Sequence, residues 1–142
     1  LKGATMKSLM TSGLKDFVQD FSSLQTPNEL TFSVTQVIEE NQGPTGLRDQ
    51  YGIYIFHTQD GYVHYVGRAI KVPLNVRVYE QVIYGQGKYR DNEWGSTVNQ
   101  PGTMITTYAL PNWPRHAIAA FEVYLIQYFK DKSQATFNKR LA

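Results

Sequence analysis

The feature that most constrains the fold is a pair of strand-like runs separated by an Asp-Gly dipeptide. Residues 52–58 and 62–66 are rich in aromatic and β-branched side chains, and Asp60-Gly61 stands between them. An Asp-Gly pair suits the type I′ turn of a two-residue hairpin. The sequence therefore predicts an antiparallel hairpin in the middle of the chain.

This turn would fix the pairing of the two strands, with Phe56 opposite Tyr65, His57 opposite His64 and Tyr54 opposite Gly67. Side chains alternate between the two faces of a strand. One face then carries Tyr54, Phe56, Val63 and Tyr65, and the other carries Ile53, Ile55, His57, His64 and Val66. The two tyrosines become diagonal neighbours about 7–8 Å apart. Gly67 would leave a notch for a substrate atom between their hydroxyls, although an ordinary aromatic-rich hairpin has the same pattern.

The segments before the hairpin predict helices. Ser12 can cap a helix whose apolar stripe includes Leu14, Phe17 and Phe21. Residues 30–41 are ambiguous, because they alternate like a strand at first and then fit a helix opened by Ser33. We favour a short helix there.

After the hairpin, Pro73 suits the first turn of a helix with an inner stripe of Leu74, Val78 and Val82. Arg77 and Gln81 share a neighbouring stripe, which we expect to face the hairpin tyrosines.

Residues 84–103 form a connector that is either a binding loop or a plain mobile loop. Tyr89, Arg90 and Trp94 offer it rings for base stacking and a cation for phosphates. Residues 104–110 then predict a third strand, with Thr103, or Thr106 and Thr107, on its exposed side.

Glu122 lies on the apolar side of the helix predicted over residues 113–131. Ile118 stands four residues before it and Ile126 four residues after it. A buried carboxylate without a partner is costly, so Glu122 needs an arginine, a hydroxyl or a metal ion. A structural salt bridge and a metal site remain equal alternatives on this pattern.

The composition sets further limits. The chain has no cysteine, which excludes disulfides, thiolate metal sites and a cysteine nucleophile. The absence of a long apolar run and of a signal-like start predicts a cytoplasmic protein without a membrane partner. Residues 52–142 hold 10 Lys+Arg against 6 Asp+Glu, whereas residues 1–51 hold 4 against 6. This asymmetry is compatible with a nucleic-acid face on the later part.

Two tripeptides of the hairpin, Gly52-Ile53-Tyr54 and Tyr65-Val66-Gly67, resemble the signature of the GIY-YIG nuclease family. The family also places an arginine in the next helix, a glutamate in a later helix and an asparagine near the end. Residues that match this order are Arg77, Glu122 and Asn138, and Arg68 matches a basic residue that one branch of the family carries after the second tripeptide.

The resemblance implies an α+β fold in which a small three-stranded antiparallel sheet is flanked by helices. Residues 51–142 would form this nuclease-like domain, and residues 1–50 a helical extension packed on its core. The implied activity is that of an endonuclease that hydrolyses phosphodiester bonds in DNA with one divalent metal ion.

In the implied site, Glu122 holds Mg²⁺ or Mn²⁺, while Arg68 and Arg77 bind the phosphate. Tyr54 or Tyr65 orients the attacking water and takes its proton, and we slightly favour Tyr54. Gln81 departs from the histidine or tyrosine that family members often carry there. The alternative is therefore a GIY-YIG-like nucleic-acid-binding or interaction module with little or no turnover.

Overall fold

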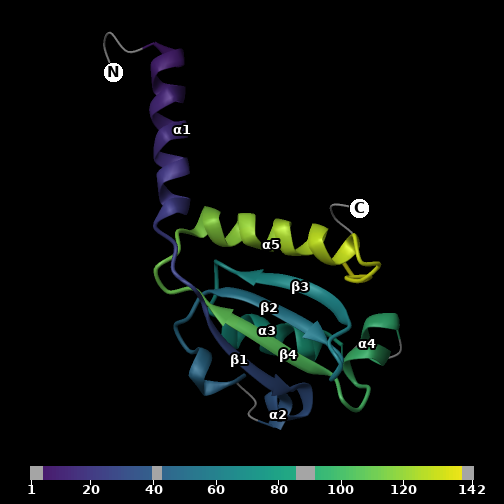
Figure 1. Ribbon diagram of the computed structural model, residues 1–142. Coiled ribbons are helices and arrows are strands. Elements are labelled where there is room, and N and C mark those ends of the chain that lie inside the picture. The colour runs from purple at the N-terminus through teal and green to yellow at the C-terminus, as the bar shows by residue number, and fades with distance from the viewer. Residues whose placement is uncertain (1–4, 40–42, 86–91, 139–142) are drawn as a thin grey trace.

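The computed structural model describes residues 5–39, 43–85 and 92–138 (Figure 1). These residues form an α+β fold with a four-stranded antiparallel sheet of order β1-β4-β2-β3. The strands are β1 (Asn28–Ser33), β2 (Gly52–His57), β3 (Val63–Ala69) and β4 (Met104–Ala109). The helices are α1 (Met6–Ser22), α2 (Val34–Glu39), the 3₁₀ turn η1 (Thr45–Leu47), α3 (Leu74–Tyr84), α4 (Glu93–Val98) and α5 (Arg115–Lys130).

The sheet has one strand more than the three expected, because residues 28–33 form β1. This strand pairs with β4 from Asn28 opposite Ala109 to Ser33 opposite Met104. The ambiguous segment is thus a strand followed by a helix, and Ser33 Oγ accepts a hydrogen bond from the backbone N–H of Gln36 at 3.2 Å. Our preference for a helix alone was wrong at this position.

β1 also buries the threonines of β4, which we expected to be exposed. Thr31 Oγ1 lies 2.9 Å from Thr106 Oγ1, and the Thr107 hydroxyl donates to the backbone carbonyl of Leu30 at 3.2 Å. A strand that is central in its sheet has neighbours on both sides, so its polar side chains find partners within the fold.

The hairpin of β2 and β3 has the predicted residue pairs in the part that lies away from its loop. Phe56 lies opposite Tyr65, and Tyr54 lies opposite Gly67. The turn differs, because the backbone N–H of Thr58 donates to the carbonyl of Tyr62 at 2.9 Å and thus closes a three-residue loop. Gly61, with a φ of 96°, takes the left-handed position that this loop type needs.

A bulge next to the loop restores the register. His57 pairs with Val63, and the register shifts between Phe56 and His57. The predicted pair of His57 and His64 is therefore wrong, and Val63 packs with Ile53 of the opposite face. When a hairpin loop is one residue longer, the side chains next to it on one strand point to the opposite face of the sheet. A bulge, which adds one unpaired residue, restores the original pairing beyond it.

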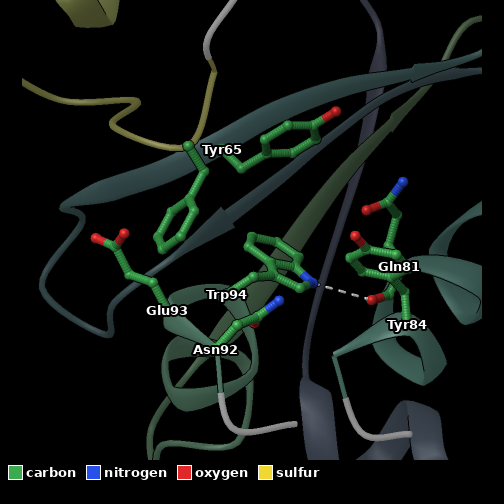
Figure 2. Close-up of a pocket in the computed structure, with 7 residues that line it drawn as sticks. Tyr65, Gln81, Tyr84, Asn92, Glu93 and Trp94 are labelled. Atoms are coloured by element: carbon green, nitrogen blue, oxygen red, sulfur yellow. Dashed lines mark hydrogen bonds between the residues drawn. The ribbon is translucent and has the colours of Figure 1, made fainter. Parts of the chain in front are cut away.

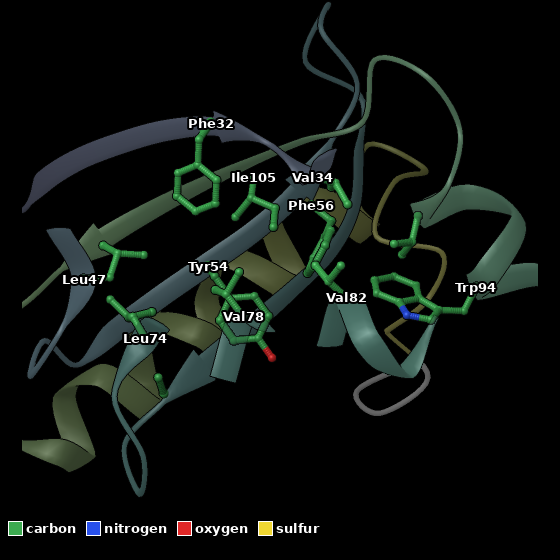
Figure 3. Packing of buried hydrophobic residues seen from close by; sticks show 12 residues of the cluster. Phe32, Val34, Leu47, Tyr54, Phe56, Leu74, Val78, Val82, Trp94 and Ile105 are labelled. Carbon is green, nitrogen blue, oxygen red and sulfur yellow. The ribbon is translucent and has the colours of Figure 1, made fainter. Parts of the chain in front are cut away.

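Hydrophobic side chains cover both faces of the sheet. On the first face, Tyr54 and Phe56 of β2 pack with Leu74, Val78 and Val82 of α3, the stripe that the sequence predicted (Figure 3). On the second face, Ile53 and Ile55 pack with Ile118 and Ile126 of α5. The sheet therefore holds α3 and α5 on opposite faces (Figure 1).

The segment after α5 covers the outer edge of β3. The backbone N–H of Val63 donates to Gln134 Oε1, and the backbone N–H of Ala135 donates to the carbonyl of Val63, each at 2.8 Å. Both backbone groups of Val66 bond the side-chain amide of Asn138, also at 2.8 Å. An exposed strand edge invites pairing with other chains, and this segment occupies it.

The described part of residues 1–50 contains the strand β1 as well as helices, and the end of α1 contacts His116 of α5 through Asp20 and Phe17. α1 has no buried residue and stands away from the sheet (Figure 1). Its cap is Thr5, whose side chain exchanges hydrogen bonds with Ser8, and not the predicted Ser12. Residues further along this segment, such as Phe32 and Leu47, belong to the core of the sheet.

Within the described ranges, no helix combines the length and the apolar character that crossing a lipid bilayer requires.

Candidate functional site

One cleft of about 890 Å³ lies beside the hairpin, between side chains of α3 and α5. The side chains that line it and that we singled out from the sequence are Tyr54, Tyr65, Arg68, Arg77, Glu122 and Asn138. Strands β2 and β3 supply the tyrosines and Arg68, α3 supplies Arg77, and α5 supplies Glu122. The fold thus brings residues of four different elements to one concave surface.

The ring of Tyr54 fills the space that we expected to be a notch at Gly67. A Cβ atom built on Gly67 would overlap the Cζ and the hydroxyl oxygen of Tyr54. Only 1% of Tyr54 is exposed. The predicted notch for a substrate atom is therefore wrong, because Tyr54 itself occupies it.

Burial raises the pKa of the Tyr54 phenol far above its ordinary value, and the neighbouring Tyr65 raises it further. The Arg77 guanidinium donates a hydrogen bond to the Tyr54 hydroxyl and only partly offsets this rise. A phenol in this environment stays protonated at neutral pH. Burial therefore makes Tyr54 a poor proton acceptor, contrary to our slight preference for it.

Tyr65 is the more accessible of the two tyrosines. It is half-buried, and its ring centroid lies 6.2 Å from that of Tyr54. The two rings share one face of the hairpin, as predicted. Tyr65 also lines the second, smaller pocket described below.

Glu122 has an arginine partner, one of the three kinds that its position predicted. Its Oε1 lies 3.4 Å from Nη1 of Arg68, and the two side chains are 16% and 41% exposed, respectively. The pair sits at the wall of the cleft and not within the closed core.

The carboxylates that line the cleft are Glu80 and Glu122. The described residues contain no group of three or more histidine and acidic side chains able to enclose a metal ion. Mg²⁺ usually takes one or two protein carboxylates and completes its shell with water and substrate phosphates. The cleft thus contains the number of carboxylates that such an ion takes from a protein, and Glu122 has Arg68 as a partner.

The cleft also contains a cation that sequence reasoning missed. Lys71 lines it together with Arg68 and Arg77. Lys71 lies where the chain leaves β3 and approaches α3, a turn without a recognisable motif. Its closeness in sequence to Arg68 was the one available signal.

The residues that we predicted as accessory or nucleic-acid contacts do not all line the cleft. Gln81 does not line the cleft but contributes to the smaller pocket, with Trp94 below Tyr65 (Figure 2). Asn138 lines the cleft, yet its amide is engaged with the backbone of Val66. Tyr89 and Arg90, our candidates for nucleic-acid contacts, lie outside the described residues.

Trp94 is a core residue and not an exposed stacking platform. It belongs to α4, within the segment that we expected to be a connector, and is 9% exposed. Its ring contacts those of Phe56, Tyr65 and Phe137 at centroid distances of 5.0, 5.6 and 5.2 Å. Trp94 is therefore not an open ring on the surface, although one side of it lines the smaller pocket.

Comparisons of this chain with models of protein families, with curated proteins and with solved structures found no match. The resemblance to GIY-YIG nucleases thus depends on the tripeptides and on the order of the matching residues alone.

Proposed function

We propose that this protein is a divalent-metal-dependent endonuclease that hydrolyses phosphodiester bonds in DNA. The observation that carries the proposal is the single cleft that contains Tyr54, Tyr65, Arg68, Arg77 and Glu122. Phosphodiester hydrolysis needs an oriented water, stabilisation of the phosphoryl charge and assistance to the leaving oxygen. This set of side chains has the chemistry for each requirement.

The cations of the cleft bind the phosphate. Arg77 is oriented by its hydrogen bond to the buried Tyr54 hydroxyl. Lys71 adds a second positive group at the rim. Arg68 contacts Glu122 in the structure, and a phosphate that enters the cleft competes with this carboxylate for the guanidinium.

Tyr65 orients the attacking water and accepts its proton in this proposal. Its phenol is half-buried and lines the cleft together with Arg68 and Arg77. Tyr54 is a positioning residue that acts through Arg77. This division of roles reverses our first preference, because burial of Tyr54 disfavours its charged form.

Glu122 would hold the Mg²⁺ or Mn²⁺ ion at the wall of the cleft. A divalent ion bound there would offset phosphoryl charge and lower the pKa of a bound water. Glu122 is suited to this task because its carboxylate faces the cleft and is partly exposed.

The alternative is a module that binds nucleic acid without turnover. One observation favours it: Arg68 already contacts an oxygen of Glu122 at 3.4 Å. If no metal displaces Arg68, the cleft offers cations to a phosphate but no means of cleavage.

Incubation of supercoiled plasmid with the purified protein distinguishes the two functions. We expect nicked and linear products with Mg²⁺ or Mn²⁺ and none with EDTA. Arg77→Gln should lose cleavage, whereas Arg115→Gln, an exposed arginine outside the cleft, should retain it. Thermal unfolding of both variants controls for misfolding. Binding of plasmid without cleavage in any divalent metal would favour the binding module.

A further inference from the structure

A second pocket of about 320 Å³ adjoins the cleft. It is lined by Tyr65, Gln81, Tyr84, Asn92, Glu93, Trp94 and Phe137. Tyr65 and Phe137 line the cleft as well. Its volume is at the lower end of small-molecule sites, which span about 300–1,000 Å³. A ligand in the cleft could therefore extend into this pocket past Tyr65.

The pocket has aromatic walls. In Figure 2, Tyr65 lies above Trp94, while Tyr84 and Gln81 of α3 lie to one side and Asn92 and Glu93 to the other. Flat rings on several sides suit a flat, aromatic ligand, because stacking is favourable on any π-face.

The floor of the pocket is rigid. The indole N–H of Trp94 donates to the backbone carbonyl of Gln81 at 3.3 Å and so ties α4 to α3. Gly85 lies directly under the indole, where an added Cβ would come within 3.1 Å of the ring. The ring is thus fixed before any ligand enters, which reduces the entropy lost on binding.

The polar groups at the rim select against a phosphate. Among the lining residues that the structure describes, Glu93 is the acidic one, and none is a lysine or an arginine. A carboxylate repels an anionic group, whereas it accepts hydrogen bonds from the N–H groups of a neutral ring. The side-chain amides of Gln81 and Asn92 add donor and acceptor atoms at the same rim. A neutral heteroaromatic ring fits this environment better than a phosphate does.

We propose that this pocket binds an unpaired nucleobase of the nucleotide next to the phosphate in the cleft, with guanine preferred. The inference rests on the proposed nuclease function, since it places the pocket along the same strand. Guanine presents two adjacent N–H donors that match the two oxygens of Glu93. A base within a duplex is stacked on its neighbours and must leave the stack to enter such a pocket. The substrate class is therefore nucleic acid with unpaired nucleotides, such as single strands and flaps.

The test measures binding of fluorescein-labelled single-stranded oligonucleotides by anisotropy in EDTA, where cleavage is absent. One probe is all thymine and the other carries a single central guanine. Wild type should bind the guanine probe more tightly. Tyr84→Ala should weaken that binding about 5-fold or more, because stacking on one ring is lost, whereas Tyr84→Phe should keep it. Glu93→Gln should reduce the ratio of guanine to thymine affinity.

The matched control is Tyr124→Ala, which removes a tyrosine that is 65% exposed on α5 and outside both cavities. It should bind both probes like wild type. The proposed nucleobase pocket would be wrong if wild type bound the two probes equally. It would also be wrong if Tyr84→Ala, shown by thermal unfolding to be folded, kept the wild-type affinity.

The plasmid assay separates this result from the proposed function. Guanine-dependent binding without cleavage of either plasmid or single-stranded DNA in Mg²⁺ or Mn²⁺ supports the pocket and contradicts the nuclease. Plasmid cleavage without guanine-dependent binding supports the nuclease and contradicts the pocket.

Discussion

The ring of Tyr54 lies across the Cα atom of Gly67, in the space that a side chain at position 67 would occupy. The two residues are direct cross-strand partners in the hairpin. The glycine of the second tripeptide is thus required by the tyrosine of the first. This contact sets the position of the Tyr54 hydroxyl, which in turn orients Arg77.

Gly67→Ala should therefore destabilise the protein. The added methyl group overlaps the Tyr54 ring, and overpacking of a core costs about 1–3 kcal/mol. Urea denaturation should show this loss of the free energy of unfolding. Gly13→Ala in α1 is the control, because a methyl group there meets nothing within 4 Å. Equal stability of Gly67→Ala and wild type would mean that the ring moves away at no cost.

The two tyrosines should differ in their effect on catalysis. Tyr65→Phe removes the proposed proton acceptor and should reduce the plasmid cleavage rate about 100-fold or more. Tyr54→Phe loses one hydrogen bond to Arg77, worth about 0.5–1.5 kcal/mol, so its loss of rate should stay within about 10-fold. Single-turnover cleavage rates measure both. The opposite order would return the role of proton acceptor to Tyr54.

Alkaline pH should destabilise the fold through Tyr54. Its pKa is raised in the folded state, so the unfolded chain releases the phenolic proton first. The stabilisation is fully present below the ordinary tyrosine pKa of about 10 and is lost as the pH rises above it. Tyr108, whose pKa is also raised by burial, acts in the same direction. We therefore expect the Tm of Tyr54→Phe to fall less than that of wild type between pH 9 and 11, and an equal fall would contradict the assignment.

Local patterns predicted the parts of the fold that depend on neighbours in the sequence. The stripe of Leu74, Val78 and Val82 is fully buried, as helical periodicity indicated. The pairs of Phe56 with Tyr65 and of Tyr54 with Gly67 were also correct. The residues selected by resemblance, Tyr54, Tyr65, Arg68, Arg77 and Glu122, all line one cleft.

The errors arose where a distant segment decides the environment. Thr106 is buried because β1 places Thr31, 75 positions away, against it. Trp94 is buried because Phe56 and Phe137 reach it from other parts of the chain. No local pattern at Thr106 or Trp94 indicates these partners.

The length of the hairpin loop is a further feature that the Asp-Gly pattern alone did not predict. The Asp-Gly pair suits both a two-residue and a three-residue loop. The Thr58 hydroxyl accepts a hydrogen bond from the backbone N–H of Tyr62 at 3.0 Å and thereby stabilises the wider one. The bulge beside His57 then follows.

Asn138 should contribute to stability more than to nucleic-acid binding. Its side-chain amide bonds both backbone groups of Val66 in a buried position. Asn138→Ala leaves these groups without partners, which costs about 1–3 kcal/mol. We expect a lower urea midpoint with little change in affinity for DNA. Gln134→Ala, which removes one bond from the same edge, should cost less. A large loss of affinity at unchanged stability would instead indicate a direct contact with DNA.

Glu122 is the position at which a metal ligand and a salt bridge make different predictions. Breaking a fully buried ion pair costs about 3–5 kcal/mol. The pair of Arg68 and Glu122 is partly exposed, however, with 41% of the arginine side chain accessible. Exposed pairs contribute about 0–1 kcal/mol. Glu122→Gln should therefore leave the Tm nearly unchanged in EDTA.

The same variant should lose cleavage by orders of magnitude if Glu122 holds the cation, because glutamine keeps the side-chain volume but not the charge. Mg²⁺ should raise the Tm of wild type and not that of Glu122→Gln, since a ligand stabilises only the state that binds it. The matched control for Glu122→Gln is Glu80→Gln, which removes the charge of the other carboxylate that lines the cleft. It should keep both the Mg²⁺ effect and most of the activity. A Glu122→Gln protein that cuts plasmid at the wild-type rate would end the assignment of Glu122 as the metal ligand.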